Sequence, residues 1–442
     1  MQRTRLIIAA FAVLGNASCA SKPVEVTTGA IVSLDTTTAR VASPRSAPAK
    51  TFWAAMTSLD PDYVHTHSVS IDERQFANAL RTIMAGDIDE AELLLDSLGR
   101  HATDSLIRSA SHILLTATLQ YQNKWKQLAE IAPPRSPRSD SIRDDRAGVE
   151  RWADAFRNVP TREISFPSNV VTLPLSVSAA GTPAIQVIIN GKPKVFWLDT
   201  GSSMSIVASD VAEEFGVAPL VADTLEVATT TGRVPARPAA IRSLELGGVS
   251  IQNATAMIVS SALMQIRSAA MDEPGPPVKI NGIVGFDIIS QLDIQVDYVK
   301  GVVRLSQPQK SPTSLAQRNF FWVGTPIVRL ISRGGLPLHF GLDTGAQETY
   351  AMERLLNKAQ VRTFLGERKR IGGFAGLKEF RGRFIPDLRL SLAGTNLIFQ
   401  KLLVFTPAVS SFIALDGVLG SDAGKTGVMR IDAMNGVFSI GR

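Results

Sequence analysis

Residues 189–207 read INGKPKVFWLDTGSSMSIV, and residues 331–350 read ISRGGLPLHFGLDTGAQETY. Both stretches read as a strand, a glycine-containing turn, a second strand and then Leu-Asp-Thr-Gly. A glycine precedes each aspartate at the same spacing, Gly191 before Asp199 and Gly335 before Asp343. The two stretches therefore indicate an internal duplication of one β-rich unit.

The duplication extends downstream of both Asp-Thr-Gly triplets, which begin at positions 199 and 343. The spacing from Gly285 to Asp297 equals the spacing from Gly420 to Asp432. At average amino-acid usage, one Asp-Thr-Gly is expected by chance in about a tenth of chains of this length. Two triplets with matched flanks are much rarer, so the pattern predicts two equivalent lobes.

Asp199 and Asp343 are the residues of this pattern that carry chemistry. Each follows an apolar run and so ends a buried strand, and the glycine that follows, Gly201 or Gly345, lets the backbone turn sharply. If the copies pair about a pseudo-twofold axis, the two carboxylates lie side by side and share one proton, because like charges at that distance do not both ionise. One carboxylate then acts as a base on water while its protonated partner polarises a carbonyl group. This arrangement hydrolyses a peptide bond without a metal, a cysteine or a histidine.

These residues resemble the retropepsin-like aspartic proteases of bacteria. The resemblance rests on Asp-Thr-Gly-Ser at 199–202, on Asp-Thr-Gly-Ala at 343–346, and on the apolar-apolar-Gly motifs at 283–285 and 418–420. It covers roughly residues 165–442. It implies that Asp199 and Asp343 are the catalytic pair and that two threonines interlock the loops. The supporting residues that it implies are Thr200, Gly201, Ser202, Thr344 and Gly345.

Enzymes of this family close a β-hairpin flap over the substrate, and this chain has two candidate hairpins. One spans residues 228–233 and the other residues 371–376. The residues predicted to belong to the flaps and to meet the substrate are Thr230, Gly232, Gly373 and Phe374. Basic residues flank the second hairpin, which favours acidic substrates or an anionic envelope surface; the alternative is a hairpin that is simply solvated.

The N-terminus has the pattern of an export signal. Arg3 and Arg5 precede a nine-residue apolar run from Leu6 to Leu14, and small residues follow before Cys19. We therefore predict a signal peptide over residues 1–18. Asn-Ala-Ser-Cys resembles a bacterial lipobox, so Cys19 is the predicted lipidation site; the alternative is an ordinary signal peptide with an incidental cysteine. The expected location is the periplasm or cell envelope, with a lipid anchor in the membrane.

The rest of the chain divides by composition. Residues 19–50 are rich in Ser, Thr, Ala and Pro and predict a flexible tether, and residues 133–164 predict a linker. Helical periodicity predicts an α-helical segment over residues 51–132, either a tetratricopeptide-like hairpin or a small cap on the main domain. Lobe 1 is predicted over residues 165–310 and lobe 2 over residues 317–442. The predicted fold class is mainly β, with two closed six-stranded lobes facing each other across a cleft.

Composition excludes several classes of protein. The chain has 442 residues, of which 45% are hydrophobic and 19% charged, and this is a globular composition. The net charge of +6 is a mild excess for this length, so no nucleic-acid partner is expected. A single cysteine excludes an intramolecular disulfide and a multi-cysteine metal site. We expect no metal and no cofactor.

The sequence thus predicts an exported aspartic endopeptidase, a hydrolase whose partners are peptide or protein substrates and the membrane. The helical segment is open to a role as a propeptide, a structural cap or a docking site for a partner protein. Three alternatives remain: a non-catalytic scaffold that binds peptides, lobes that each form homodimers, and aspartates that merely cap their loops. Both Asp-Thr-Gly triplets are intact, which favours the enzyme, and the short connector at residues 306–325 favours pairing within the chain.

Overall fold

A computed structural model describes most of the chain. The described residues are 31–35, 51–131, 145–178, 181–229, 232–266, 277–311, 313–373, 376–407, 411–425 and 427–441. The predicted signal peptide, Cys19, Thr230 and Phe374 lie outside these residues. Within them, no helix combines the length and the hydropathy that crossing a membrane requires. Export, lipidation and the roles of these two flap residues therefore stay predictions.

Lobe 1 is a closed barrel of six strands. Each strand is hydrogen-bonded to the next in the order β5, β6, β13, β7, β10 and β9, and β9 pairs again with β5. The turn between β5 and β6 is Asn190-Gly191, with φ angles of 49° and 84°, a pair that suits the type I′ turn of a two-residue hairpin. The strands are β5 (Pro183–Ile189), β6 (Lys192–Leu198), β7 (Ser205–Ala208), β9 (Arg233–Leu246), β10 (Val249–Val259) and β13 (Gly282–Val284).

Lobe 2 repeats this ring strand for strand. Its order is β17, β18, β23, β19, β22 and β21, and β21 pairs again with β17. The strand before each aspartate pairs in parallel with the short glycine strand, β6 with β13 and β18 with β23. The mainly β fold with two closed six-stranded lobes is therefore confirmed. The strands are β17 (Pro326–Ser332), β18 (Pro337–Leu342), β19 (Tyr350–Ala351), β21 (Gly376–Leu392), β22 (Thr395–Val404) and β23 (Gly417–Leu419).

The short strands β13 and β23 each contain a glycine, Gly282 or Gly417, that allows close packing against the strand leading to an aspartate. A Cβ atom at Gly282 would overlap the ring of Phe196, and one at Gly417 would overlap the ring of Phe340. Both rings come from the strand that leads to an aspartate. Glycine therefore allows β13 and β23 to lie directly against the aromatic residues of β6 and β18.

A five-stranded sheet joins the lobes. Its centre is an antiparallel pair of β14 from lobe 1 and β24 from lobe 2, with Asp293 opposite Asp432. Arg430 Nη2 also donates to Asp293 Oδ2 across this pair, at 2.8 Å. The lobes thus pair within one chain, which argues against separate homodimers of each lobe. In order across the sheet, the strands are β25 (Val437–Gly441), β24 (Val428–Asp432), β14 (Asp293–Asp297), β15 (Val302–Ser306) and β3 (Val170–Pro174).

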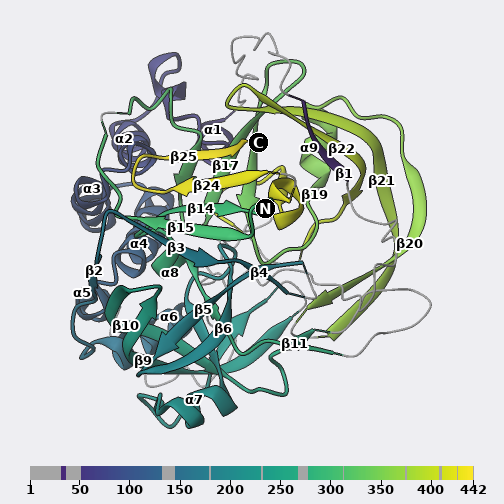
Figure 1. The fold of residues 1–442 in the computed structure, drawn as a ribbon. Coiled ribbons are helices and arrows are strands. Elements are labelled where there is room, and N and C mark those ends of the chain that lie inside the picture. Colours follow the sequence, from purple (N-terminus) through teal and green to yellow (C-terminus); the bar gives the residue numbers. More distant parts are fainter. Residues whose placement is uncertain are drawn as a thin grey trace.

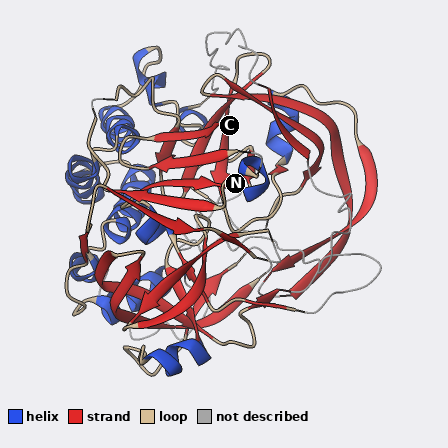
Figure 2. Ribbon diagram, in the orientation of Figure 1, coloured by secondary structure: helices blue, strands red, loops and turns tan. Residues whose placement is uncertain are grey.

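Shorter elements complete the lobes (Figures 1 and 2). Hairpins β8–β9 and β20–β21 occupy the two positions predicted for flaps. The remaining strands are β1 (Ile31–Asp35), β2 (Glu163–Ser165), β4 (Ser176–Val177), β8 (Leu225–Ala228), β11 (Gln265–Ile266), β12 (Val278–Lys279), β16 (Phe320–Trp322) and β20 (Leu365–Gly373). The helices within the lobes are α7 (Ser209–Phe215), α8 (Phe286–Ile289), α9 (Glu353–Lys358) and the 3-10 turn η2 (Ser421–Gly424).

The N-terminal helices gather on one side of the β-structure, in purple and blue in Figure 1. The first long helix, α2, begins at a capping box in which Ser70 and Glu73 each bond the other's backbone N–H, and it ends at Gly86 with a φ of 82°. The elements are α1 (Phe52–Met56), η1 (Pro61–His65), α2 (Ile71–Ala85), α3 (Ile88–His101), α4 (Ser105–Tyr121), α5 (Trp125–Ile131) and α6 (Asp145–Phe156).

These helices form a cap that packs on both lobes, and they share one hydrophobic core with them. Phe76 on α2 contacts Phe412 of lobe 2, with ring centroids 6.1 Å apart. Tyr121 at the end of α4 stacks on Trp322 of lobe 2 at 4.3 Å and lies 6.2 Å from Phe286 of lobe 1. The structure therefore favours the small cap over a free-standing repeat array.

Two predicted connecting segments contain regular structure. The predicted linker, residues 133–164, includes α6, because Trp152 and Phe156 lie one helical turn apart and both are buried; Phe156 packs on Trp125 with ring centroids 4.7 Å apart. The predicted tether, residues 19–50, includes β1, which pairs antiparallel with residues 396–400 of β22. β21 lies along the other side of β22, and β19 pairs only with Leu403 and Val404, so β1 pairs the part of β22 that the barrel leaves open.

The shared core leads to a prediction about the helical cap. A protease recognition sequence inserted between α5 and α6, at residues 132–144, allows the cap to be cut from the rest of the chain. We expect helices α1–α5 to stay bound after cutting, because leaving would expose the apolar surfaces of the cap and of both lobes. Size-exclusion chromatography of the cut chain, with and without urea, measures this. A helical fragment that elutes separately in native buffer would instead identify the cap as a detachable propeptide.

Candidate active site

The two predicted catalytic aspartates lie at equivalent places in the two barrels. Asp199 follows β6, and its N–H donates to Val284 O at 3.1 Å; Asp343 follows β18, and its N–H donates to Leu419 O at 3.0 Å. The residues are only 1% and 3% exposed. Each aspartate is thus fixed by the neighbouring glycine strand of its own lobe.

Two threonines connect the loops across the boundary between the lobes. Thr344 Oγ1 accepts from the N–H of Thr200 at 3.0 Å and donates to Leu198 O at 2.8 Å. In the reverse direction, Thr200 Oγ1 accepts from the N–H of Thr344 at 3.0 Å and donates to Leu342 O at 2.9 Å. These four buried bonds are reciprocal, and they lock the two aspartate loops at one separation.

The carboxyl groups of Asp199 and Asp343 meet directly and hydrogen-bond to each other. Gly201 N–H donates to Asp199 Oδ1 at 2.8 Å, and Ala346 N–H donates to Asp343 Oδ1 at 2.9 Å. A Cβ atom at Gly345 would overlap the Asp199 carboxyl group, so glycine is needed there for the two loops to approach.

Burial is the largest cause of the raised pKa values of Asp199 and Asp343. It raises the pKa of Asp199 to about 6, although donors in both loops oppose the rise. It also raises the pKa of Asp343 well above its usual range, and the neighbouring negative charge of Asp199 adds to this rise. Near neutral pH the pair therefore shares one proton.

The predicted supporting residue Ser202 bonds within its own loop. It is fully buried, and its hydroxyl donates to Met204 O at 2.7 Å, so it braces the turn after Asp199. Of the predicted flap residues, Gly232 is exposed at the β8–β9 turn, and Gly373 is buried at the end of β20, opposite Gly376. The catalytic and substrate-binding roles of all these residues stay predictions.

Sequence reasoning missed residues that link the second hairpin to the Asp343 loop. Tyr350 is buried on β19 in a cluster with Ile371 of β20; burial, and then the charge of Asp343, raises its pKa. Glu348 and Lys369 of β20 form an ion pair at 2.8 Å. Glu348 and Tyr350 follow Asp343 closely in the sequence. A position-by-position comparison of the residues after Asp199 and Asp343 would have identified them as differences between the two copies.

An arginine from outside both barrels supports the Asp199 loop. Arg162, between α6 and β2, has a side chain 7% exposed; it donates to the carbonyl oxygen of Asp287 and lies 3.6 Å from the Asp287 carboxylate. Asp287 Oδ1 accepts from Ser205 Oγ at 3.0 Å. The neighbouring N–H of α8, that of Phe286, donates to Ser202 O at 2.7 Å. Arg162 is therefore a positioning residue that holds the start of α8 beneath the loop.

The helical cap completes this network through Asn123, in the turn between α4 and α5. Its Oδ1 accepts from Arg162 at 3.1 Å, from Thr255 Oγ1 at 3.0 Å and from Trp125 Nε1 at 2.7 Å. Burial raises the pKa of Asp287, and the charge of Arg162 opposes this rise. No sequence signal marked Asn123 or Arg162, because both lie outside the duplicated unit.

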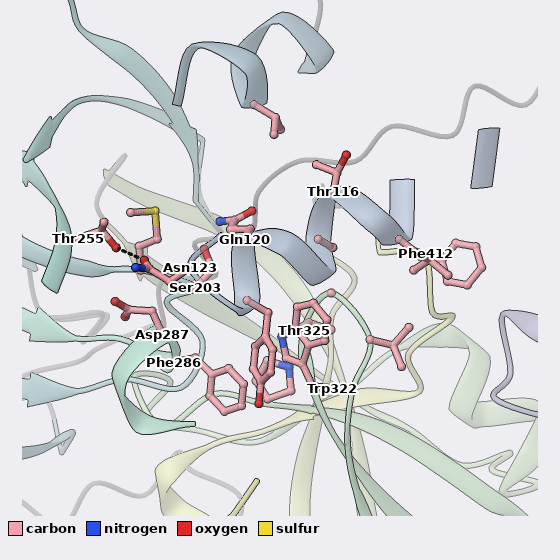
Figure 3. A pocket seen from close by; sticks show the side chains of 18 of the residues that line it. Thr116, Gln120, Asn123, Ser203, Thr255, Phe286, Asp287, Trp322, Thr325 and Phe412 are labelled. Atoms are coloured by element: carbon pink, nitrogen blue, oxygen red, sulfur yellow. Dashed lines mark hydrogen bonds between the residues drawn. The ribbon is translucent and has the colours of Figure 1, made fainter. Parts of the chain in front are cut away.

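Figure 3 shows a cavity where the cap meets both lobes. It has a volume of about 60 Å³ and is lined by Gln120 of α4, Ser203 of the Asp199 loop, and Trp322 and Phe412 of lobe 2. Asp287 faces it with an Oδ2 that has no hydrogen-bond partner among the described residues. The described residues contain no group of three His, Cys, Asp or Glu side chains arranged to hold a metal ion.

The state of the buried pair predicts how stability depends on pH. A carboxyl group whose pKa is raised by folding stabilises the folded state at low pH, and this contribution is lost as pH rises through the folded pKa. Asp343→Asn removes such a group without removing its shape. We expect the variant to match the parent chain near pH 3.5 and to exceed its free energy of unfolding at pH 7.5 by at least about 1.4 kcal/mol, the equivalent of one pKa unit.

Urea denaturation at the two pH values measures this difference. Asp210→Asn is the control, because Lys279 and Ser261 lower the pKa of Asp210 to about 2, so its removal should lower stability at pH 7.5. If Asp343→Asn is also less stable than the parent at pH 7.5, the buried pair does not share a proton as described.

Removing Arg162 should leave the buried Asp287 carboxylate without its counter-charge. We expect Arg162→Met to lower the free energy of unfolding by about 3–5 kcal/mol, and Asp287→Asn in the same chain to restore most of the loss. The matched control is Lys279→Met, which breaks an exposed ion pair with Asp210 and should cost less than about 1 kcal/mol. Equal effects of Arg162→Met and Lys279→Met would contradict the support role of this network.

Part of lobe 1 is similar in sequence to a known protein family. Residues 185–288 match a family described as Aspartyl protease. Among solved structures, a retropepsin-like aspartic protease from Rickettsia conorii is 15% identical, with a TM-score of 0.21, over 33% of this chain and 94% of that one. No curated protein sequence matches. The resemblance to retropepsin-like aspartic proteases is thus confirmed: the sequence of lobe 1 between residues 185 and 288 matches the aspartyl protease family, and lobe 2 repeats the same ring of strands around Asp343.

Proposed function

We propose that this protein is an aspartic endopeptidase with both catalytic aspartates in one chain. The observation that carries the proposal is the buried pair of Asp199 and Asp343, which lies between two interlocked loops and holds one proton near neutral pH. A scaffold that only binds peptides has no need for two buried carboxyl groups. Their mutual burial destabilises the folded chain at neutral pH, and proton sharing in catalysis gives a reason for keeping them.

Because the pair shares one proton, its two members take different roles. Asp199 is the base that takes a proton from a water molecule held between the pair. Asp343, the protonated member, donates a hydrogen bond to the carbonyl oxygen of the substrate. The water oxygen attacks the carbonyl carbon, and the proton taken by Asp199 passes to the leaving nitrogen as the C–N bond breaks. The pair ends with one proton, as it began.

We also propose that the chain works outside the cytoplasm, in the cell envelope. The support is the basic, apolar and small-residue pattern of residues 1–18, followed by Cys19. Lipidation at Cys19 would keep the enzyme on a membrane surface, where its peptide or protein substrates would be envelope proteins. Mass spectrometry of the mature N-terminus tests this part separately from the peptidase activity.

A cleavage assay tests the peptidase proposal. The chain from residue 20 onward is incubated with a proteome-derived peptide library across a pH series, and mass spectrometry reads the new termini. We expect cleavage by the parent chain and at least a hundredfold loss in both Asp199→Asn and Asp343→Asn. The control Asp210→Asn removes an exposed carboxylate from lobe 1 and should cleave normally. Binding of peptides without cleavage at any pH would favour the scaffold instead.

The pH dependence of cleavage should follow the proton count of the pair. Below pH about 6, Asp199 gains a proton and the base is lost; at high pH, Asp343 loses its proton and the hydrogen bond to the carbonyl is lost. We expect a bell-shaped profile with its optimum near neutral pH. A rate that stays flat from pH 4 to pH 10 would be incompatible with a shared proton.

A further inference from the structure

The net positive charge of the chain is concentrated in one part of lobe 2. Between residues 362 and 401 there are nine Lys and Arg against three Asp and Glu, an excess of six. The whole chain has the same excess, with 46 Lys and Arg against 40 Asp and Glu. The rest of the chain is therefore neutral overall, and five of the six excess charges lie in hairpin β20–β21 and the neighbouring strand β22.

The register of the hairpin places two of these charges directly opposite each other. Arg368 on β20 faces Arg381 on β21, and both side chains are exposed. Like charges directly opposite on paired strands destabilise a sheet. Within the described part of the chain, neither arginine has an ion pair or a hydrogen bond from its side chain. The pair thus lacks an anion that would stabilise it.

Two further arginines flank this pair on the same face. Ile371 of β20 and Phe384 of β21 are buried, so alternation along the strands directs Arg368, Arg370, Arg381 and Arg383 to the outside. We call these four residues the outer arginine face. Arg370 bonds Glu379 at 3.1 Å and Arg383 pairs with Glu353, which leaves Arg368 and Arg381 as its two uncompensated charges.

We propose that the outer arginine face binds the phosphate groups of an anionic membrane surface. Guanidinium groups present paired N–H donors that match phosphate oxygens. Figure 1 places β20 and β21 along the periphery of lobe 2, on the side away from the helical cap. The proposal concerns an attachment surface and does not depend on the peptidase activity.

The direction of strand β1 favours a membrane over an acidic protein. Ile31, the first residue of β1, pairs with Gln400 of β22, and Asp35 pairs with Asn396. Along β22, the end beyond Gln400 leads to Val404, which pairs with Arg383. Strand β1 therefore begins toward the end of β22 that pairs with Arg383 of the outer arginine face.

The number of residues between Cys19 and Ile31 limits the distance between a lipid anchor at Cys19 and the start of β1. Only residues 20–30 separate Cys19, the predicted lipidation site, from Ile31. A segment of about a dozen residues spans at most about 40 Å when fully extended. An anchor at Cys19 would therefore keep the outer arginine face close to the bilayer, and the two contacts together would hold the molecule more firmly than either alone.

Vesicle binding tests the proposal on the chain from residue 20 onward, which has no lipid and no signal peptide. The probes are vesicles of phosphatidylcholine alone and vesicles containing one third phosphatidylglycerol. We expect binding to the anionic vesicles only, and weaker binding as salt is raised. At about fivefold for each basic residue at the surface, the double variant Arg368→Gln with Arg381→Gln should bind about 30-fold more weakly.

The matched control removes the same number of charges elsewhere. Arg242 and Arg333 are exposed outside the hairpin, and their double replacement by Gln lowers the net charge equally. Unfolding temperatures of all variants establish that each is folded. An equal loss of binding in the control would overturn the proposal, as would equal binding to both kinds of vesicle or no binding to either. Tighter binding to poly-glutamate than to anionic vesicles would also overturn it and identify an acidic protein as the partner.

Discussion

The reciprocal bonds between Thr200 and Thr344 are the constraint on which the site depends. Each hydroxyl accepts from the opposite threonine and donates to the carbonyl of the opposite strand end. Leaving such a buried group unsatisfied costs about 1–3 kcal/mol, so the loops cannot part at this point without losing several bonds together. The carboxyl groups of Asp199 and Asp343 are neighbours because the threonines hold them there, against the unfavourable desolvation of both acids.

Burying two carboxyl groups side by side lowers the stability of the folded chain, so other contacts must hold the two lobes together. The sheet that pairs β14 with β24 joins the lobes, and the helical cap contacts both lobes through Phe76 and Tyr121. Arg162 adds a charge beneath the Asp199 loop, where it faces the buried Asp287, and it is itself bonded to Asn123 of the cap. The cap is thus part of the frame of the site as well as a cover over apolar surface.

The lobes could be predicted from the sequence because their signals are local and occur twice. Asp-Thr-Gly, the preceding apolar runs and the glycine strands reflect close approaches that few other residues permit, as at Gly345 beside Asp199. The contribution of Arg162 could not be predicted, since its partner Asp287 is distant in the sequence and nothing periodic connects them. β1 and α6 could not be predicted because the sequence around them is polar and rich in Pro. They are stabilised by tertiary contacts, β1 by pairing with β22 and α6 by packing on Trp125.

Because both copies lie in one chain, they can differ at positions that are identical in the two subunits of a homodimer. At matching positions after the aspartate, lobe 1 has Met204 and Ile206, whereas lobe 2 has Glu348 and Tyr350. Lobe 2 links these side chains to hairpin β20–β21 through Lys369 and Ile371. Lobe 1 instead receives Arg162 from outside its barrel. The surroundings of the two aspartates therefore differ: buried apolar side chains, Met204 and Ile206, follow Asp199, whereas an ion pair to the second hairpin and a buried tyrosine follow Asp343.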